Sequence, residues 1–517
     1  MRRITESSSR ASSGPSCFGS ASSKTGSPAG AGEWALRMNR TKLLLLLCPS
    51  WFATMGATQE PTLTSDDPER AHEGLRFFND PGPLSAGAVV EDWPGFLGPR
   101  RDGHSRETGL RKSFPEEGLV LVWSREIGGG YAGPAIVGER LVFTHREGNE
   151  TLIDCLEAST GRRFWQHRRP CEYSGRFIRD GGPRATPTIA GGRVFVHGVE
   201  GVLCCLELES GELLWQRNFQ KDFGSGDDFF GVVSSPLVHE GLLIQQVGAN
   251  EGATVVALDV ATGEERWRAE NGWGPSCASP VVGILAGRKR LFVLAGGESR
   301  PPVGGLLVLD PKSGEVAFNF SFRSRRELSV VGATPIVGDG FVLVTDGYSA
   351  GTVALEIDAK EGLRPRWRNR MGFEFTNPLY VEGRVWAVDG VSGRAGAITC
   401  LDPESGEELW RRDIDWLERV YSAGSVKELS LSIGQGSILA VDGDLLCLGD
   451  DGALLWIETS AGAIAIRDRT RLFHALQAWT PPVVNRGLLY VCQNNRERFG
   501  VKPEPPRLLC FDLRAVD

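Results

Sequence analysis

The chain has 517 residues, with 57 Lys and Arg against 65 Asp and Glu, so its formal net charge is −8. A mildly acidic chain lacks the basic surface that neutralises nucleic-acid phosphates, which excludes a nucleic-acid-binding protein. Hydrophobic residues make up 41% of the chain, enough for a large folded core. The 66 Gly, 29 Pro and 14 Trp, without a long apolar run, exclude a membrane-spanning bundle and predict short elements joined by tight turns.

The first 90 residues carry no copy of the repeat found further along the chain. Residues 1–37 are rich in Ser, Gly and Ala, which predicts disorder or an upstream extension outside the native protein. From Met38, residues 38–57 show a basic, then an apolar, then a small-residue stretch, as in a secretory signal peptide. Cys48 follows three leucines instead of a small residue, which argues against lipidation there. Residues 58–90 are polar and are expected to be a linker.

Residues 91–118 form a separate segment that contains the sequence W-P-x-F-x-G-P-x-R-D-G, from Trp93 to Gly103. From 119 to 513 the chain is governed by a repeat, whose best copy runs from Ala257 to Trp267. Each copy places an acidic residue, a Ser/Thr–Gly pair and a closing aromatic at fixed spacing. The residues that carry this pattern are Trp123, Trp165, Trp215, Asp259, Gly263, Trp267, Asp310, Gly314, Trp367, Asp402, Gly406 and Trp410.

A second marker precedes each copy: a small or polar residue, then Pro, then an apolar run ending at a Gly-containing turn. Two short strands around a tight turn predict a hairpin, and the repeat adds a third and a fourth strand. Four antiparallel strands in units of roughly 43 to 52 residues are typical of a β-propeller blade. The markers lie at Gly133-Pro134, Thr186-Pro187, Ser235-Pro236, Ser279-Pro280, Thr334-Pro335, Asn377-Pro378 and Thr480-Pro481.

The blade count depends on two irregular units. Residues 434–462 lack the Pro marker but keep strand-like runs, so they are interpreted as a degenerate blade. The last unit, Pro481 to Leu513, ends before a fourth strand can form. Leu119 to Ile127 would supply it, leaving no open sheet edge. The sequence therefore predicts an all-β protein: an eight-bladed β-propeller of four-stranded antiparallel blades, closed by an N-terminal strand that completes the last blade.

The repeated residues are expected to be structural. Each Trp is interpreted as a packing anchor between blades, and each Asp or Glu as an acceptor for backbone amides of the following turn. Cysteines at 155, 205, 400 and 510 share one strand position, where Cys behaves as a small buried hydrophobe. The adjacent pair Cys204 and Cys205 leaves a vicinal disulfide open. The seven His lack ligand spacing, so no metal site is predicted.

The pattern from Ala257 to Trp267 resembles the repeat of pyrroloquinoline-quinone (PQQ) type β-propellers. This superfamily contains quinoprotein alcohol dehydrogenases and the non-enzymatic BamB-type scaffold that assists outer-membrane protein assembly. The segment from Asp92 to Leu110, together with Gly182 to Pro187, is similar to the exported PQQ-like repeat proteins of planctomycetes and related bacteria. Membership of the superfamily implies no cofactor by itself, because one fold hosts many functions.

The resemblance implies two functions of different classes. The first is a non-catalytic propeller without cofactor that binds proteins or glycans in the periplasm or cell envelope of a Gram-negative-type bacterium. The alternative is a periplasmic alcohol or sugar dehydrogenase with PQQ and Ca²⁺. Dehydrogenases of this type resemble propellers with long insertions and a calcium held by carboxylate and amide side chains. The blades here carry no large insertion and no alignable calcium triad, so the enzyme is the less favoured expectation.

A ligand is expected where the loops leading into the inner strands converge. Aromatic and charged groups in these loops suit a polar, flat or anionic ligand. Arg184 and Asn377 are the preferred candidates, because each lies within three residues of a Pro marker. Ordinary solvated loops remain the alternative. The remaining candidates are Arg176, Asp180, Asp228, Trp273 and Trp479.

Overall fold

The structure is a computed structural model that describes residues 74–515. All of these belong to the second of two compact units, residues 56–517. The first unit, residues 1–55, lies outside the described residues, as do the expected signal peptide and residues 58–73 of the expected linker. Within 74–515 the description omits 175–180, 226–229, 250–251, 298–301, 328, 359, 361, 392–394, 423–424, 460–461, 476 and 495–504.

The described residues form eight sheets, built mainly from antiparallel strands that follow one another along the chain. The first four sheets have four strands each. They contain β4 (Ala135–Val137), β5 (Arg140–Glu147), β6 (Glu150–Glu157) and β7 (Arg163–Pro170); β8 (Thr188–Ala190), β9 (Arg193–His197), β10 (Val202–Glu207) and β11 (Leu213–Asn218); β12 (Leu237–His239), β13 (Leu242–Gln246), β14 (Ala253–Asp259) and β15 (Glu265–Glu270); and β16 (Val281–Leu285), β17 (Arg288–Ala295), β18 (Gly305–Leu309) and β19 (Val316–Ser321).

The other four sheets come from the second half of the chain and from its N-terminal part. They contain β20 (Ile336–Gly338), β21 (Phe341–Asp346), β22 (Gly351–Asp358) and β23 (Gly362–Asn369); β24 (Leu379–Val381), β25 (Arg384–Gly390), β26 (Gly396–Leu401), β27 (Glu408–Ser422) and β28 (Ser425–Ser432); β29 (Ser437–Val441), β30 (Asp444–Leu448), β31 (Ala453–Glu458), β32 (Ala465–Arg471) and β2 (His104–Ser105); and β33 (Val483–Asn485), β34 (Leu488–Gln493), β35 (Arg507–Asp512), β3 (Val120–Glu126) and β1 (Leu75–Phe77).

This architecture confirms the prediction of an all-β protein whose four-stranded antiparallel sheets are consistent with a β-propeller. It differs from the prediction in three sheets, each of which has a fifth strand. β28 extends β27 into a hairpin, β2 adds to β29 in parallel, and β1 adds to the outer side of β3 within the expected linker. The one described helix, α1 (Phe219–Phe223), is too short to cross a bilayer.

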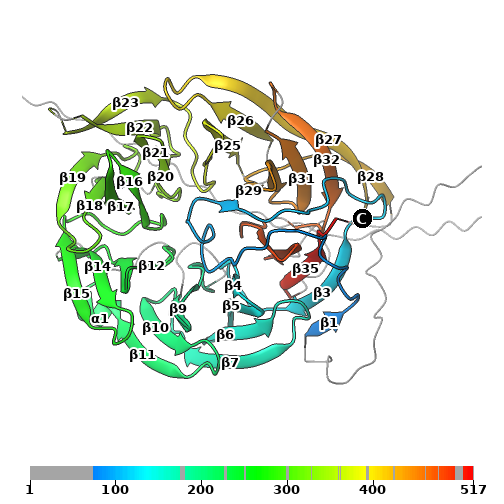
Figure 1. Cartoon of the computed structure of the whole chain (residues 1–517), viewed down its shortest axis with the longest axis horizontal. Coiled ribbons are helices and arrows are strands. Elements are labelled where there is room, and N and C mark those ends of the chain that lie inside the picture. Colours follow the sequence, from blue (N-terminus) through cyan, green and yellow to red (C-terminus); the bar gives the residue numbers. More distant parts are fainter. Residues whose placement is uncertain are drawn as a thin grey trace, which may run out of the picture. The chain divides into compact units, whose positions relative to one another are not determined.

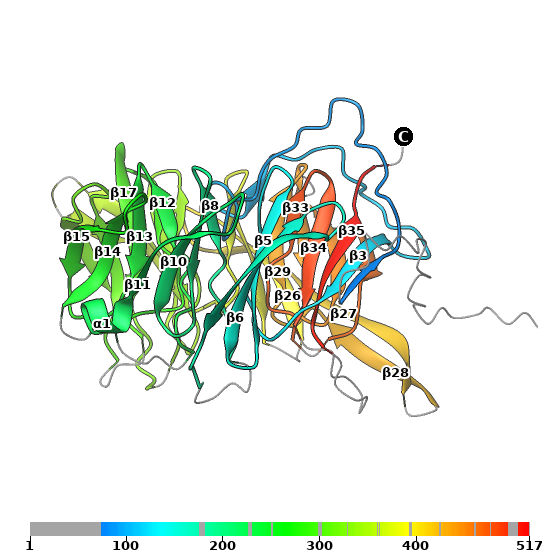
Figure 2. The same cartoon turned by 90° about the horizontal axis from the view of Figure 1, so that it is seen from below.

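The sheets lie around a common centre, which we call the central axis (Figure 1). The shortest strand of most sheets, such as β4, β8 or β20, is the innermost one. We call the side that carries the tight turns after these innermost strands the short-turn face. The opposite side, which carries the connections between sheets, is the long-loop face. Residues 78–119 run along the short-turn face, whereas the β27–β28 hairpin projects from the long-loop face (Figure 2).

Neighbouring sheets are joined by contacts between the repeated aromatic and the repeated glycine. A side chain on Gly211 would lie 2.5 Å from the Trp165 ring, and one on Gly314 would lie 2.3 Å from the Trp267 ring. Both glycines have left-handed φ values, 74° and 73°, which side chains disfavour. The same contact recurs for Gly161 on Trp123, Gly263 on Trp215 and Gly406 on Trp367.

The repeated Asp stabilises the turn that presents this glycine. Oδ1 of Asp259 accepts hydrogen bonds from the amides of Ala261 and Thr262, at 2.8 and 3.1 Å. Oδ1 of Asp310 and of Asp402 binds the corresponding amides of its own turn. These copies therefore use Asp to form a turn, Gly to allow close approach and an aromatic ring to cover it, whereas Glu157 and Glu207 in the first two copies accept the hydroxyl of the following Thr160 or Ser210.

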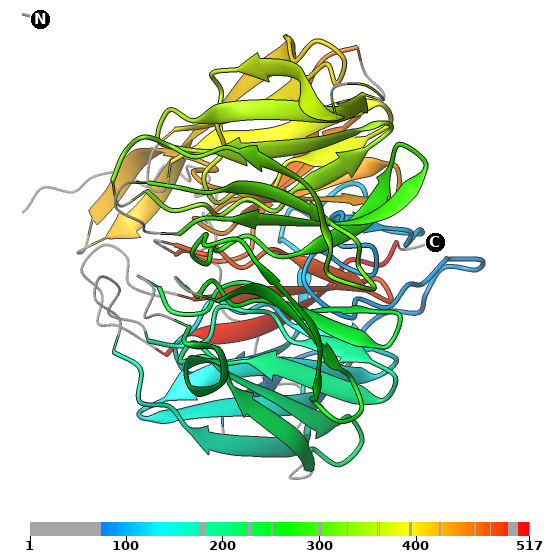
Figure 3. The same cartoon turned by 90° about the vertical axis from the view of Figure 1, so that its left-hand side faces the viewer.

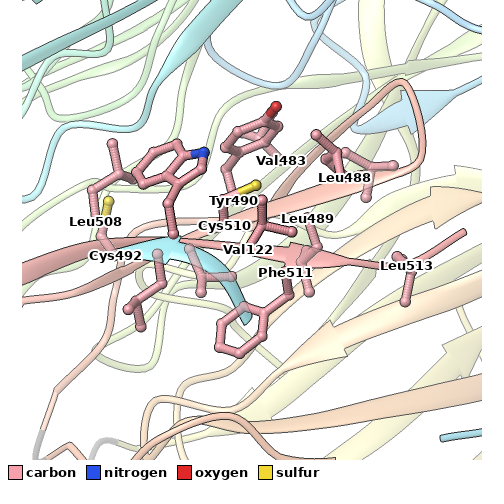
Figure 4. Packing of buried hydrophobic residues seen from close by; sticks show 14 of the residues in the cluster. Val122, Val483, Leu488, Leu489, Tyr490, Cys492, Leu508, Cys510, Phe511 and Leu513 are labelled. Atoms are coloured by element: carbon pink, nitrogen blue, oxygen red, sulfur yellow. The ribbon is translucent and has the colours of Figure 1, made fainter. Parts of the chain in front are cut away.

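The last sheet combines both ends of the described chain. β3 pairs antiparallel with β35, and Trp123 lies opposite Cys510. Val122 on β3 packs beside residues of β34 and β35 in one buried cluster (Figure 4). The end of the described chain, after β35, also lies beside residues 78–119, where the Arg111 amide donates to the Leu513 carbonyl (Figure 3).

The described cysteines are free and mostly buried. Cys204 and Cys205 are adjacent on β10, yet they belong to different core clusters, because successive strand residues point to opposite sides of a sheet. Burial raises the pKa of the Cys204 thiol to about 11 and that of Cys205 to about 12. These thiols therefore act as core side chains, and the vicinal disulfide is not formed.

Candidate functional site around the central axis

A chain of hydrogen bonds runs around the axis through the residues that precede the marker prolines. The Gly133 amide donates to Oγ1 of Thr186, and the Thr186 amide donates to Oγ of Ser235, at 3.1 and 2.9 Å. The series continues from Ser235 to Ser279, from Ser279 to Thr334 and from Thr334 to Asn377. The polar residue before each of these prolines therefore has a structural role, because its side chain accepts a backbone amide from the neighbouring sheet.

This series defines the role of Asn377, one of the two preferred ligand candidates. Its Oδ1 accepts the Thr334 amide at 2.8 Å, and Thr334 is buried. An unpaired buried amide would cost free energy, so the Asn377 carbonyl oxygen stabilises the contact between two sheets. Thr186, Ser235 and Ser279 occupy the same sequence position, which is the signal that identifies this role.

Three aromatic rings meet where the long-loop face reaches the axis. Tyr131, Phe375 and Trp479 each stand four residues before an innermost strand, β4, β24 and β33 respectively. The Trp479 ring is stacked on Phe375 with centroids 6.1 Å apart, and it lies 5.4 Å from the Tyr131 ring. The buried Nε1 of Trp479 has no hydrogen-bond partner among the described residues. Trp479 is thus the predicted candidate that lies in an aromatic cluster at the axis.

The remaining predicted candidates are not brought into this cluster. Arg184 is half-buried and donates to the Gly182 carbonyl at 2.8 Å. Trp273 packs against the core cluster between the third and fourth sheets, which contains Trp267. Arg176, Asp180 and Asp228 lie outside the described residues.

A buried ion pair on the long-loop face has no counterpart in the sequence predictions. Nη1 of Arg323 lies 3.1 Å from Oδ2 of Asp346, and the two side chains are 5% and 0% exposed. Nη2 of Arg323 also donates to the Gly297 carbonyl at 3.1 Å. Burial raises the pKa of Asp346 to about 7, against the opposing effect of the guanidinium. The pair joins the connection after β19 to the last residue of β21, and neither position belongs to the repeat pattern, so the sequence gives no signal for it.

The turn after Asp346 is strained and carries further ionisable groups. Tyr348 and Ser349 have φ values of 52° and 67°, and neither is Gly. Burial raises the pKa of the Glu374 carboxyl, and that of the Tyr348 hydroxyl is raised as well. The Arg326 guanidinium lies 5.6 Å from the centroid of the Tyr348 ring. Two carboxyl groups, a phenol and two guanidinium groups are thus gathered on the long-loop face.

The short-turn face is covered near the axis by residues 91–107 of the chain, which we call the N-terminal segment. The amide of Trp93 donates to the Ile136 carbonyl at 2.9 Å, and the Ile136 amide donates back at 2.7 Å. The Ile189 amide donates to the Pro94 carbonyl at 2.8 Å. At its other end, β2 pairs in parallel with β29. The segment therefore crosses the axis by backbone pairing with innermost strands.

Two buried charged side chains fix this segment. Arg101 is 8% exposed, and its guanidinium donates to the carbonyls of Ser235 and Pro236 at 3.0 and 2.7 Å. Burial lowers the pKa of Arg101 to about 9. The Glu107 carboxylate accepts the amides of Arg486 and Gly487 in the turn after β33, and burial raises its pKa. The segment is thus a fixed part of the fold.

The segment leaves a pocket, which we call the axial pocket, against the innermost strands β16, β20 and β24. Its volume is ≈ 340 Å³, within the range of small ligand sites. One wall is apolar and includes Leu97, Val282 and Val337. The rim carries Arg100 and Asp102 from the segment, and Asp339, whose Oδ2 accepts the Tyr380 hydroxyl at 3.0 Å.

The described residues at the axis do not match the needs of a bound quinone with calcium. The oxygen of Asn377 is engaged by the Thr334 amide, and Arg101 is engaged by two carbonyls. Within the described ranges, no group of three or more His, Cys, Asp or Glu side chains is placed to share a metal ion. We therefore derive no redox step from this site.

The sequence matches a family model described as outer membrane protein assembly factor BamB, PQQ_2, over residues 149–411 and 394–501. Among curated proteins, the outer membrane protein assembly factor BamB of Burkholderia pseudomallei is 27% identical over 328 residues, covering 60% of this chain and 74% of the relative. BamB of Xanthomonas campestris pv. campestris is 28% identical over 344 residues, covering 60% and 79%. The family-model match lies in the repeat-bearing part of the chain.

The fold is also similar to that of solved structures. The quinohemoprotein alcohol dehydrogenase from Comamonas testosteroni superposes with a TM-score of 0.55 at 13% sequence identity, covering 82% of this chain and 81% of the other. At this identity the similarity concerns the fold alone.

Proposed function

The chain belongs to the PQQ_2 family of outer membrane protein assembly factor BamB, and from this premise we propose that it is an exported, non-catalytic binding or scaffold protein of the cell envelope. The observation that carries the proposal is the N-terminal segment, which fills the short-turn end of the axis with its own backbone and with Arg101. Because this segment covers the short-turn end of the axis except at the axial pocket, the outer surfaces, long loops and strand edges are left for macromolecular partners.

We further propose that the eight sheets are the blades of one propeller spanning residues 119–513. In this arrangement β3 is the closing strand, because it pairs with β35 and places Trp123 against Gly161 of the first sheet. Residues 38–57 would direct export, and the partner would be a protein or glycan of the envelope. The names of the relatives support a protein engaged in outer-membrane assembly.

The proposal is tested by deleting the gene in the source bacterium and measuring the folded fraction of outer-membrane β-barrel proteins by heat-modifiable gel mobility. We expect a lower folded fraction, restored by the wild-type gene. As a matched test of the alternative dehydrogenase, purified protein is mixed with PQQ and Ca²⁺. Stoichiometric uptake with alcohol-dependent dye reduction, together with unchanged outer-membrane assembly, would contradict the scaffold function.

A further inference from the structure

The N-terminal segment shows how the innermost strands bind an extended chain. In a pair of antiparallel strands, every second residue points both its N–H and its C=O group away from the partner strand. Ile136, opposite Leu141, and Ile189, opposite Val194, are such residues, one step from the turn. Both amides donate to the N-terminal segment, at the carbonyls of Trp93 and Pro94.

The axial pocket repeats this geometry in the next sheets. Val337 lies opposite Val342, and Tyr380 lies opposite Val385, again one step from the turn. β16 is longer, so two of its residues, Ile284 and Val282, point their N–H and C=O groups away from the neighbouring strand β17. All four residues line the pocket. The same backbone groups that hold the chain's own segment in the first and second sheets therefore face the pocket in the fourth, fifth and sixth sheets.

No described strand pairs with β16, β20 or β24 on this side, because each is the terminal strand of its sheet. Such an edge is a template for an added strand, and recognition by strand addition is common between proteins and peptides. We propose that the axial pocket binds a short extended peptide, which adds as a strand to the axial edge of β16 or β20. This inference deepens the proposed function, on which it rests for the class of partner.

The side chains of the pocket define the peptide that fits. Val281, Ile284 and Leu97 form an apolar wall, and Ile284 is 65% exposed. Of the charged rim residues, Arg100 already pairs with Glu91, at 2.6 Å. The pocket therefore selects β-branched and apolar side chains on an extended backbone, with no requirement for charge.

The test uses the full chain and a fluorescein-labelled five-residue peptide of alternating Thr and Val, with blocked ends. Its matched control is the same peptide with N-methyl groups on alternate amides, which keeps the side chains and removes the backbone donors. By fluorescence anisotropy we expect saturable binding of the first peptide and binding about tenfold weaker, or none, for the N-methylated one, since strand addition depends on backbone hydrogen bonds. Equal affinity of the two peptides, or no binding of the first, would overturn the proposal.

Variants locate the site. In Val282→Pro and Val337→Pro the lost amide faces the pocket and not the neighbouring strand, so the sheet keeps its hydrogen bonds. We expect each to weaken peptide binding about five- to tenfold, by the loss of one or two backbone hydrogen bonds. The matched control is Val238→Pro, at the same register position of β12 but outside the pocket.

Unchanged affinity in both pocket variants, with Val238→Pro equally unaffected, would place the peptide elsewhere and overturn the proposal. If circular dichroism shows that a proline variant does not fold, Ile284→Arg is used in its place. The arginine side chain would occupy an exposed position of the pocket, so we expect the same loss of peptide affinity, about five- to tenfold. Loss of outer-membrane assembly in the deletion strain is independent of these measurements, so a failed peptide site and a failed scaffold function give different results.

Discussion

The two faces of the molecule at the central axis differ in how their polar groups are satisfied. On the short-turn face, Arg101 and Glu107 are buried, and each binds backbone groups of another sheet. On the long-loop face, Oδ1 of Asp346, Nε of Arg323 and Nε1 of Trp479 are buried without a partner among the described residues. Nε of Arg101 and Oδ1 of Asn485, on the short-turn face, are also buried without a partner among the described residues. The faces therefore differ in what their buried charges bind: backbone groups of another sheet on the short-turn face, and an opposite charge on the long-loop face.

The turns of the two faces differ in the same sense. On the short-turn face, residues with positive φ, such as Glu382 and Asp442, are followed by Gly in two-residue hairpins. Such turns match the twist of the strands and store little strain. On the long-loop face, Tyr348 and Ser349 are consecutive non-Gly residues with positive φ. Leu97 and Arg101, on the short-turn face, also have positive φ values, 59° and 56°, so what distinguishes the long-loop turn is that its two strained residues are consecutive.

The largest expected effect concerns the pH dependence set by Asp346. Its pKa in the folded protein, raised to about 7, exceeds the unfolded value, so the folded state binds the extra proton between about pH 4 and pH 7. The stabilisation of the folded state by this proton is complete below about pH 4 and is lost as the pH rises through 7, on the order of 4 kcal/mol in total.

Urea unfolding of wild-type protein and Asp346→Asn between pH 4.5 and 8 measures this effect. The free energy of unfolding should fall with pH in the wild type relative to the variant, which lacks the titrating group. Arg323, Glu374, Tyr348 and Arg326 remain in both proteins, so the difference in slope isolates the carboxyl group. Parallel curves would contradict the raised pKa.

On the short-turn face, Arg101→Ala removes the donors to two buried carbonyls and should lower the free energy of unfolding by about 2 kcal/mol. Limited proteolysis should then cleave between residues 91 and 105, where the wild type resists. Arg106→Ala, at an exposed position of the same segment, is the control and should change stability by less than about 0.5 kcal/mol. A resistant Arg101→Ala protein would show that backbone pairing alone holds the segment.

A smaller effect on the free energy of unfolding is expected from the series of hydrogen bonds around the axis. Asn377→Ala leaves the buried Thr334 amide unpaired and should cost about 1 kcal/mol in urea unfolding. Asn377→Asp keeps an acceptor oxygen and should restore most of the loss. Equal losses in both variants would mean that the side chain acts through something other than this hydrogen bond.

The sequence predicted the all-β class and the sheet pattern because the repeat of Asp, Gly and Trp is local. It missed β1, β2 and β28, which have no repeat position. β2, with only two residues, exists because Arg101 and its neighbours contact sheets far away in sequence; the Arg101 guanidinium binds Pro236, 135 positions along the chain. Local patterns carry no information about such contacts.

The candidate site shows the same division. Trp479 was identified because aromatic residues near a marker proline are conspicuous, and it lies in an aromatic cluster at the axis. Asn377 was predicted as a ligand candidate, and the recurrence of Thr and Ser at its position, a signal of a structural hydrogen bond, was overlooked. Arg323 lies in the connection after β19 and Asp346 ends β21, and neither is a repeat position, so only the folded chain brings them together.

The smallest expected effect tests whether the strain on the long-loop face is intrinsic to the backbone. Ser349 is exposed with a φ of 67°, so Ser349→Gly relieves a left-handed conformation at an exposed site. Because Gly also gains entropy in the unfolded chain, the net stabilisation should be only about 0.5 kcal/mol, measured by thermal unfolding. Ser349→Ala retains the strain and should leave the melting temperature unchanged. A gain in Ala equal to that in Gly would assign the effect to the lost hydroxyl and remove backbone strain from the contrast between the two faces.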